Sequence, residues 1–392
     1  MHSVRSSRRR AVAFLVPALL VACGAGRAVA APATAAQGPI VGERPFAPKP
    51  FVATPVARFE SPWAMAFLPD GRMLVTQKAG RMLLVSADGK QRTAVAGMPR
   101  VAPAGQGALG EVVLHPDFAR NGLVYFSYSE SKGAGQGTAL ARARLVGDIA
   151  RGARLDGLKV IYRAHPYVSG EGQYAGRILF TGDGHLFFST GERQKFTPAQ
   201  DPKGTLGKIL RLNEDGTPAP GNPLAAKGFD PAIWSYGHRN PLGLAFDATG
   251  RLWETEMGPR GGDELNLILP GRNYGWPLVS NGDNYDGTPI PRHATRPDLE
   301  APRLSWNPSI SPANLLIYSG AMFPGWKGEA LIGGLSGRML IRVTIDADGN
   351  AREAARYDMG ARIRAVDQGP DGAIYLLEDG SNARLLRLTP RR

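Results

Sequence analysis

The chain has 392 residues, which is enough for one large all-β domain or two ordinary domains. Its 50 Gly and 32 Pro punctuate apolar runs without a collagen-like period, so the composition favours a turn-rich β fold over disorder. The formal charge is +13, but several arginines lie in the first ten residues and the others are dispersed. Without a basic helix or a nucleic-acid-binding motif, this charge predicts no nucleic-acid partner.

The N-terminus reads as an export signal over residues 1–22. Basic residues precede an apolar stretch, Ala11 to Ala22, that is too short to span a bilayer. Leu20 to Cys23 has the form of a lipobox, which would place a lipid anchor on Cys23, whereas Ala28 to Ala30 fits ordinary signal peptidase. Both interpretations predict an exported protein, either periplasmic or anchored in the membrane as a lipoprotein. Cys23 is the only Cys, so the mature chain has no internal disulfide and no c-type haem attachment.

The remaining chain divides into a predicted flexible linker and one domain. Residues 23–50 are rich in Ala, Pro and Gly, as flexible tethers are, and residues 51–392 form the predicted domain. Within this domain an apolar strand, a tight turn and a second apolar strand recur. The clearest copies have Asp-Gly turns, in which Gly tolerates a positive φ. They are Trp63–Thr76, Arg177–Thr190 and Ile363–Leu377, and weaker copies begin at Val112, Leu242 and Leu315.

Several copies continue into a third strand with the pattern apolar-apolar-Arg-apolar. These strands are Ile209–Leu212, Leu340–Val343 and Leu385–Leu388. Six repeated units predict an all-β, six-bladed β-propeller, in which residues 51–58 pair with the last blade and close the ring. A β-sandwich is the alternative, but sandwiches lack such internal self-similarity. A propeller binds its ligand in the long loops at one mouth of the central channel.

Four loops rich in Gly and polar residues fit such a mouth. They are Gly105–Gly110, Trp234–Gly243, Glu256–Pro277 and Arg362–Arg364. In this order they resemble the glucose/sorbosone dehydrogenase family of soluble quinoprotein aldose dehydrogenases, from about residue 51 to the C-terminus. The third loop is the most specific, because it ends in Asn-Tyr-Gly-Trp-Pro. The resemblance implies a six-bladed propeller that holds pyrroloquinoline quinone (PQQ) and calcium.

The resemblance assigns a set of cofactor-binding residues. PQQ is a flat tricarboxylate with an electrophilic ortho-quinone, so its site needs cations in a fixed fork geometry and planar amides. Gln106 matches a residue beside the sugar hydroxyls. The predicted cofactor-binding residues are Arg239, Asn240, Ser309, Arg362 and Arg364. Arg362 and Arg364 flank one apolar residue, so they should point the same way on a strand.

The resemblance also implies two calcium sites. Gly258 and Pro259 match the position at which backbone carbonyls hold the cofactor calcium, an all-oxygen arrangement that suits this ion. Glu264 with the Tyr274 carbonyl resembles a second, structural site, for which Asp283 is a further candidate ligand. The alternative makes Asp263 and Glu264 solvated turn residues. His238, beside the Arg-Asn pair, fits a structural and a functional role equally well.

The match breaks at the catalytic base. The family uses a His four residues before an Arg; here the Arg is Arg177 and the base position is Gln173, which cannot accept a proton. Two further departures are Ser336, where a Lys is common, and Leu242, where a Gln is common.

Three functions therefore stay open. The first is PQQ-dependent oxidation of an aldose to a lactone by hydride transfer to the quinone, with Glu171 as the replacement base, Gln173 orienting a water, and an unidentified electron acceptor. The second is a propeller that binds the quinone or a sugar without turnover. The third is a calcium-dependent, lactonase-like hydrolase, which rests on fold analogy alone.

Overall fold

Almost all regular structure in the chain is β. The computed structural model describes residues 37–391, which belong to one compact unit, Thr34–Arg392. The predicted export signal and both predicted cleavage sites lie outside these described residues. The helices of the described part are single turns: α1 (Phe118–Asn121), η1 (Thr197–Gln200), η2 (Ala225–Lys227), η3 (His293–Thr295) and η4 (Pro324–Trp326). None of them is long and apolar enough to cross a membrane.

The strands of residues 37–391 form six sheets. An eight-stranded sheet has the order β3 (Pro62–Phe67), β4 (Met73–Gln77), β5 (Arg81–Val85), β6 (Arg92–Ala96), β10 (Gly152–Arg163), β9 (Gly135–Asp148), β8 (Leu123–Lys132), β7 (Leu109–Leu114). A four-stranded sheet has the order β11 (Ala175–Phe180), β12 (His185–Thr190), β13 (Lys208–Asn213), β14 (Ile233–Tyr236). A five-stranded sheet has the order β1 (Ile40–Val41), β20 (Leu304–Trp306), β18 (Asp263–Ile268), β16 (Leu252–Glu256), β15 (Pro241–Phe246).

The other sheets complete the set. One four-stranded sheet has the order β21 (Pro312–Ile317), β22 (Ala330–Gly334), β23 (Met339–Ile345), β24 (Ala351–Asp358). Another has the order β2 (Phe51–Phe59), β27 (Ala383–Pro390), β26 (Ile374–Glu378), β25 (Ile363–Gln368). The smallest pairs β17 (Arg260–Gly261) with β19 (Gly282–Asp283). Each hairpin and each third strand predicted from the repeats is present, because the apolar runs pair as antiparallel neighbours.

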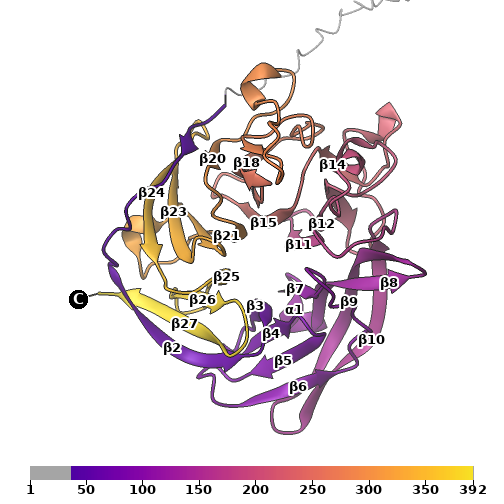
Figure 1. Cartoon of the computed structure of the whole chain (residues 1–392). Helices are drawn as coiled ribbons and strands as arrows, with labels where there is room; N and C mark the ends of the chain where they lie inside the picture. The colour runs from indigo at the N-terminus through magenta and orange to yellow at the C-terminus, as the bar shows by residue number, and fades with distance from the viewer. Residues whose placement is uncertain (1–36, 392) are drawn as a thin grey trace, which may run out of the picture. The chain divides into compact units, whose positions relative to one another are not determined.

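One strand from each hairpin unit faces a common centre. The contacts run from β3 to β7, β11, β15, β21 and β25, and β25 contacts β3 again (Figure 1). We call these six the inner strands. Their cyclic contacts make the arrangement of this unit propeller-like, and neighbouring sheets bury apolar side chains between them. Trp253 and Trp306, for example, lie in one apolar cluster with Ile332 and Ile341 of the next sheet.

The Asp-Gly turns explain the short hairpins. Gly71, Gly184 and Gly372 have φ values of 85°, 80° and 78°, in the left-handed region that glycine adopts at no steric cost. At the first of these turns the Asp70 carboxylate accepts a hydrogen bond from the Arg72 backbone N–H at 3.1 Å. These local preferences set the strand registers without help from distant residues.

The predicted closure of the domain by its N-terminal strand is confirmed. β2 pairs antiparallel with the C-terminal β27, from Phe51 opposite Pro390 to Phe59 opposite Ala383. Phe51 is 1% exposed and packs edge-on against Trp326 and Tyr357. The first and last strands of the domain therefore share one sheet.

Part of the segment predicted as a flexible linker is bound to the fold. Within residues 23–50, Ile40 and Val41 form β1, which pairs parallel with Ser305 and Trp306. The backbone N–H of Ala47 donates to the Arg356 carbonyl at 2.9 Å. Backbone hydrogen bonds give this Ala-, Pro- and Gly-rich stretch a fixed path, which composition alone does not reveal.

Candidate functional site

The first residues of the inner strands line a cavity of about 290 Å³, which we call the first cavity. Polar and charged side chains meet apolar ones in its wall. Four of the residues predicted from the sequence lie there together: Gln106, Asn240, Arg362 and Arg364. Other lining residues include Trp63, Lys78, Tyr174, Met257, Tyr285 and Ser311.

Positive charge gathers in this wall. Arg362 and Arg364 point to the same carboxylate, as predicted, and donate to Asp379 at 2.8 Å and 2.9 Å. Burial opposes ionisation of Asp379, but Arg364 and Arg362 hold its pKa below the ordinary value. Burial, followed by the charge of Arg364, lowers the pKa of Lys78. The lining of the first cavity contains three cations, Lys78, Arg362 and Arg364, and no carboxylate. A bound polyanion would relieve this repulsion.

A second cavity, of about 390 Å³, adjoins the first. Tyr285 lines both, and Arg239 of the second cavity precedes Asn240 of the first in sequence. The Arg239 guanidinium lies 5.2 Å from the centre of the Trp276 ring and 5.8 Å from that of Tyr285. It donates to the Met257 and Gly258 carbonyls and to the Tyr285 hydroxyl, so its position is fixed.

Two of the three predicted catalytic residues line these cavities, Gln106 the first and Gln173 the second. The backbone N–H of Gln173 donates to Gln106 Oε1 at 2.8 Å, and Gln173 Oε1 accepts from the Gln194 N–H at 3.2 Å. Gln173 lines the second cavity and is 3% exposed. Glu171 is exposed and lines neither cavity, although its carbonyl accepts the Gln106 N–H at 2.7 Å.

Sequence reasoning did not single out Glu192, which lines the second cavity beside Gln173. Its side chain is buried, and Oε2 accepts the backbone N–H groups of Lys195 and Phe196, each at 2.5 Å. Burial raises the pKa of Glu192, against the lowering effect of these hydrogen bonds and of Arg239. A raised carboxyl pKa is a common property of catalytic acids and bases.

The predicted calcium ligands separate into groups. Gly258, Glu264 and Tyr274 line a small cavity of about 10 Å³, close to the ~10–15 Å³ that a single water needs by this measure. Pro259 lines the second cavity instead. The Asp283 carboxylate pairs with Arg292 at 2.7 Å rather than with the other ligands. Asp263 is not a solvated turn residue, because it is 1% exposed and accepts the N–H groups of Gly258, Ile310 and Ser311.

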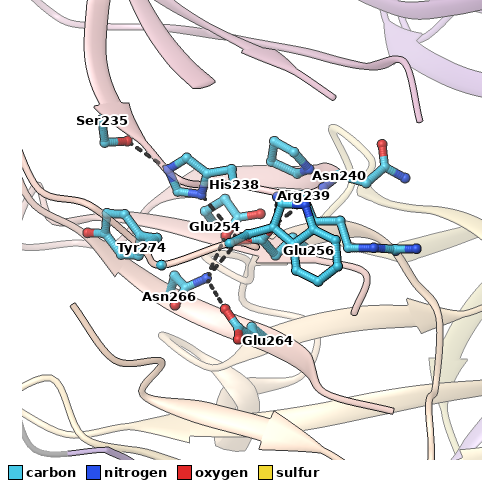
Figure 2. Close-up of polar contacts among 12 residues, drawn as sticks. Ser235, His238, Arg239, Asn240, Glu254, Glu256, Glu264, Asn266 and Tyr274 are labelled. Carbon is cyan, nitrogen blue, oxygen red and sulfur yellow. Dashed lines mark hydrogen bonds and ion pairs between the residues drawn. The ribbon is translucent and has the colours of Figure 1, made fainter. Parts of the chain in front are cut away.

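Behind this cavity lies a buried polar network, drawn in Figure 2. Asn266 Nδ2 lies 3.0 Å from Glu254 Oε2 and 3.1 Å from Glu264 Oε2. His293 contacts the other Glu264 oxygen at 3.1 Å. His238 is fully buried between Ser235 and Glu256, which favours the structural interpretation of this residue. Burial and the charge of Glu256 raise the pKa of Glu254 well above the ordinary value.

The residues present fit both groups that the sequence resemblance implies, PQQ and calcium. Among the described residues, Asn240 Oδ1 and Arg239 Nε are buried without a hydrogen-bond partner, and these two residues border the cavities. The first cavity adds Arg362, Arg364 and Lys78 for an anionic ligand. Glu254 Oε1 is also buried without a partner beside the carboxylates of the network, as oxygen ligands of a hard cation would be. Ser309 fits less well, since its hydroxyl accepts from Gly261 N–H and Ser311 takes its place in the cavity wall.

Arg177 contacts Trp63 and Leu242 of the first cavity and lines a third cavity. Its guanidinium donates to Glu111 of β7 at 2.6 Å, to the Leu242 carbonyl of β15 at 2.5 Å and to the Ala313 carbonyl of β21. It also lies 4.2 Å from the centre of the Trp63 ring. The third cavity, of about 380 Å³, is lined by later residues of the same inner strands, including Glu111, Arg177 and Asp367.

A propeller-like fold with a cation-lined cavity at the first residues of its inner strands defines a class of ligand-binding β proteins. Comparison with known proteins narrows that class. The model of the family described as Glucose / Sorbosone dehydrogenase matches residues 59–387. The chain belongs to this family.

One relative and two solved structures illustrate the similarity. Aldose sugar dehydrogenase YliI of Escherichia coli (strain K12) is 37% identical over 342 residues, which cover 85% of this chain and 91% of the relative. The crystal structure of the soluble aldose sugar dehydrogenase from Escherichia coli in the apo-form has a TM-score of 0.81 at 36% identity, covering 87% of this chain and all of that one (100%). The PQQ-bound aldose sugar dehydrogenase of Streptomyces coelicolor has a TM-score of 0.72 at 28% identity, covering 88% and 100%.

Proposed function

We propose that this protein oxidises aldose sugars to lactones with PQQ as the hydride acceptor and calcium as its metal. The observation that carries the proposal is the meeting of Arg362, Arg364, Asn240 and Gln106 in one cavity with surplus positive charge. The family and the PQQ-bound relative support the same chemistry. We also propose that the fold is a six-bladed propeller, supported by the six inner strands in cyclic contact.

Each side chain has a role in this proposal. Arg362, Arg364 and Arg239 bind the cofactor carboxylates, and Asn240 supplies a planar amide to its edge. When bound, the quinone accepts a hydride from C1 of the sugar and calcium polarises the quinone carbonyl. Gln106 and Gln173, joined by a hydrogen bond, orient the sugar hydroxyls.

The proton of the C1 hydroxyl needs an acceptor other than Gln173. We propose a neighbouring carboxylate, for which Glu171 is the first candidate because it lies two residues away and is exposed. Glu192 is the second candidate, because it lines the same cavity as Gln173 and has a raised pKa. Calcium is proposed at Gly258 and Pro259 and, separately, at Glu264 and Tyr274.

The test is reconstitution of the purified chain with calcium and PQQ. Absorbance measures quinone binding, and a panel of aldoses with an artificial electron acceptor measures turnover. Arg364→Ala should weaken quinone binding at least about tenfold, since a hydrogen bond to a charged group contributes about 1.5–3 kcal/mol. The control is Arg387→Ala, because Arg387 lies on β27, away from the first cavity, and its guanidinium pairs with Asp371.

Two outcomes would contradict the proposal. If Arg364→Ala and Arg387→Ala weaken quinone binding equally, the cofactor does not bind in this cavity. If the wild type and Gln173→His both bind the quinone but oxidise no aldose, the protein is a binding protein and not a dehydrogenase.

A further inference from the structure

We propose that a cavity of about 470 Å³, between the sheet that contains β2 and the eight-stranded sheet, binds a phosphate monoester. We call it the arginine pocket, because Arg58 of β2, Arg81 of β5 and Arg92 of β6 line it together. Figure 1 shows β2 next to β5 and β6. The arginine pocket shares no lining residue with the first or the second cavity, so this inference goes beyond the proposed function and does not depend on it.

The arginine pocket carries positive charge that no nearby carboxylate pairs with. Among residues 37–391, none of its three arginines forms an ion pair, whereas Arg384 and Arg387 of the adjacent β27 each pair with a carboxylate. Glu60 is the one carboxylate in the described lining. Three positive charges and one negative charge give the lining a net charge of +2. A phosphate monoester carries about −1.5 to −2 at pH 7, so the two charges match.

Two of the three guanidiniums are fixed in position by neutral groups. Arg58 Nη1 donates to the Asn382 carbonyl at 2.9 Å, and Arg92 Nη1 donates to the Arg58 carbonyl at 2.7 Å. The Arg92 guanidinium also lies 5.9 Å from the centre of the buried Phe59 ring. Each guanidinium has five N–H donors in a planar fork, so one bond to a carbonyl leaves several donors for phosphate oxygens. The positive groups are therefore held in place before a ligand binds.

A buried amide without a protein partner also lines the arginine pocket. Gln77 of β4 is only 5% exposed, yet its side chain forms no hydrogen bond within residues 37–391. Leaving a buried amide without a partner is unfavourable, and buried polar side chains are normally hydrogen-bonded. A phosphate oxygen in the pocket would accept a hydrogen bond from this amide. Gln77 thus indicates a ligand independently of the three arginines.

The arginine pocket has room for the organic part of the ester as well as its phosphate. Its volume of about 470 Å³ lies within the ~300–1,000 Å³ that is usual for small-molecule sites. Phe59 and Leu83, which belong to the apolar cluster between the two sheets, form part of the lining. Apolar surface beside a few placed charges is the usual composition of such a site.

The experiment titrates the purified chain with glycerol 3-phosphate, and isothermal titration calorimetry measures the Kd. We expect Arg81→Gln and Arg92→Gln each to raise this Kd at least about tenfold, because each removes a charge-assisted contact to the phosphate. The Tm of each variant, measured without ligand, should stay close to that of the wild type, since both arginines are exposed. An unchanged Kd in both variants would overturn the proposal.

Two further substitutions separate ligand binding from a structural role. Glu60→Gln should tighten binding about twofold, because it removes the negative charge from the lining. Gln77→Leu should weaken binding without lowering the Tm, because the buried amide has no protein partner to lose. A lower Tm with an unchanged Kd in Gln77→Leu, or weaker binding in Glu60→Gln, would contradict the site.

Two controls exclude other positions for the phosphate. Arg154 is also exposed, lies on β10 beside β6 and does not line the arginine pocket, so Arg154→Gln should leave the Kd unchanged. Arg364→Ala should leave it unchanged too, because Arg364 lines the first cavity. A loss in Arg154→Gln equal to that in Arg92→Gln would show non-specific attraction to a basic surface. An equal loss in Arg364→Ala would place the phosphate in the first cavity, and either result would overturn the proposal.

A phosphate monoester can come from a soluble compound or from a lipid headgroup. Cosedimentation with vesicles of phosphatidylcholine, with and without phosphatidic acid, separates these sources. Binding to phosphatidic acid that Arg92→Gln abolishes would identify a headgroup as the ligand. Binding of glycerol 3-phosphate without cosedimentation would identify a soluble ester. If the wild type binds neither glycerol 3-phosphate nor the phosphatidic acid vesicles, the arginine pocket is not a phosphate site.

Discussion

Gln173 lies at the position where the sequence resemblance predicts a proton acceptor, and its amide oxygen accepts the Gln194 N–H. We predict that Glu171→Gln lowers kcat about 10²- to 10⁴-fold with unchanged quinone affinity, since that is the usual contribution of a general base. Steady-state rates and absorbance titration measure the two effects. Gln173→His should raise kcat, because imidazole accepts protons near neutral pH.

The alternative carboxylate gives a different result. If Glu192→Gln lowers kcat and Glu171→Gln does not, the proton acceptor is Glu192. Its pKa is raised by burial, so wild-type activity should then fall as the pH drops through that raised value, because a protonated carboxyl cannot accept a proton. A rate unchanged by both substitutions would exclude a carboxylate base.

Glu264 supports a second prediction at the residue scale. Its cavity has room for about one ion, and a bound ion stabilises the folded state by mass action. Chelation should lower the Tm of the wild type but leave the Tm of Glu264→Gln nearly unchanged. Glu353→Gln, at a buried carboxylate paired with Arg356, should lower the Tm and keep the response to chelator. A wild-type Tm that is unchanged by chelator would show that no stabilising ion is bound at Glu264.

Among the elements, β13 controls the loop that carries Phe196. Lys208 of β13 is fully buried, and its Nζ donates to the carbonyls of Pro198, Ala199 and Leu206 at 2.7, 3.0 and 2.8 Å. Lys208→Met would leave these carbonyls without a donor. We expect a loss of about 1–3 kcal/mol in the free energy of unfolding, measured by denaturant titration.

Lys203→Met is the control for this loop, since Lys203 is exposed and its ammonium donates to the Gly228 carbonyl. It should change the free energy of unfolding by less than about 0.5 kcal/mol. Similar losses in the two variants would show that the buried ammonium does not hold the loop.

The elements also show what sequence could predict. Asp-Gly turns such as Asp70-Gly71 act locally, so the hairpins could be predicted from sequence. The third strands and the shared direction of Arg362 and Arg364 could be predicted from local sequence pattern. Lys78 and Glu192 could not be predicted as cavity residues. In the sequence each resembles an ordinary loop charge, and only strands distant in sequence bring it to a cavity wall. Tyr285 lies in a turn of polar residues. The binding of Ile40–Val41 to β20 and of Ala47 to β24 depends on backbone hydrogen bonds that composition does not encode.

At the scale of the whole domain, closure depends on β2. A chain that starts at residue 60 would leave β27 as an exposed edge and remove Phe51 from an apolar cluster. We predict loss of cooperative thermal unfolding, or aggregation, in that truncation. Removing only residues 1–36 should leave the Tm unchanged. A truncated chain from residue 60 that melts like the full chain would contradict the role of β2.

The position of Arg177 has a kinetic consequence. Its guanidinium joins β7, β15 and β21, stacks on Trp63 of the first cavity and lines the third cavity. If it separates these two cavities, the sugar, the lactone and the electron acceptor of the proposed reaction share one opening. A lactone bound there would block the acceptor, so we predict that steady-state rates follow ping-pong kinetics.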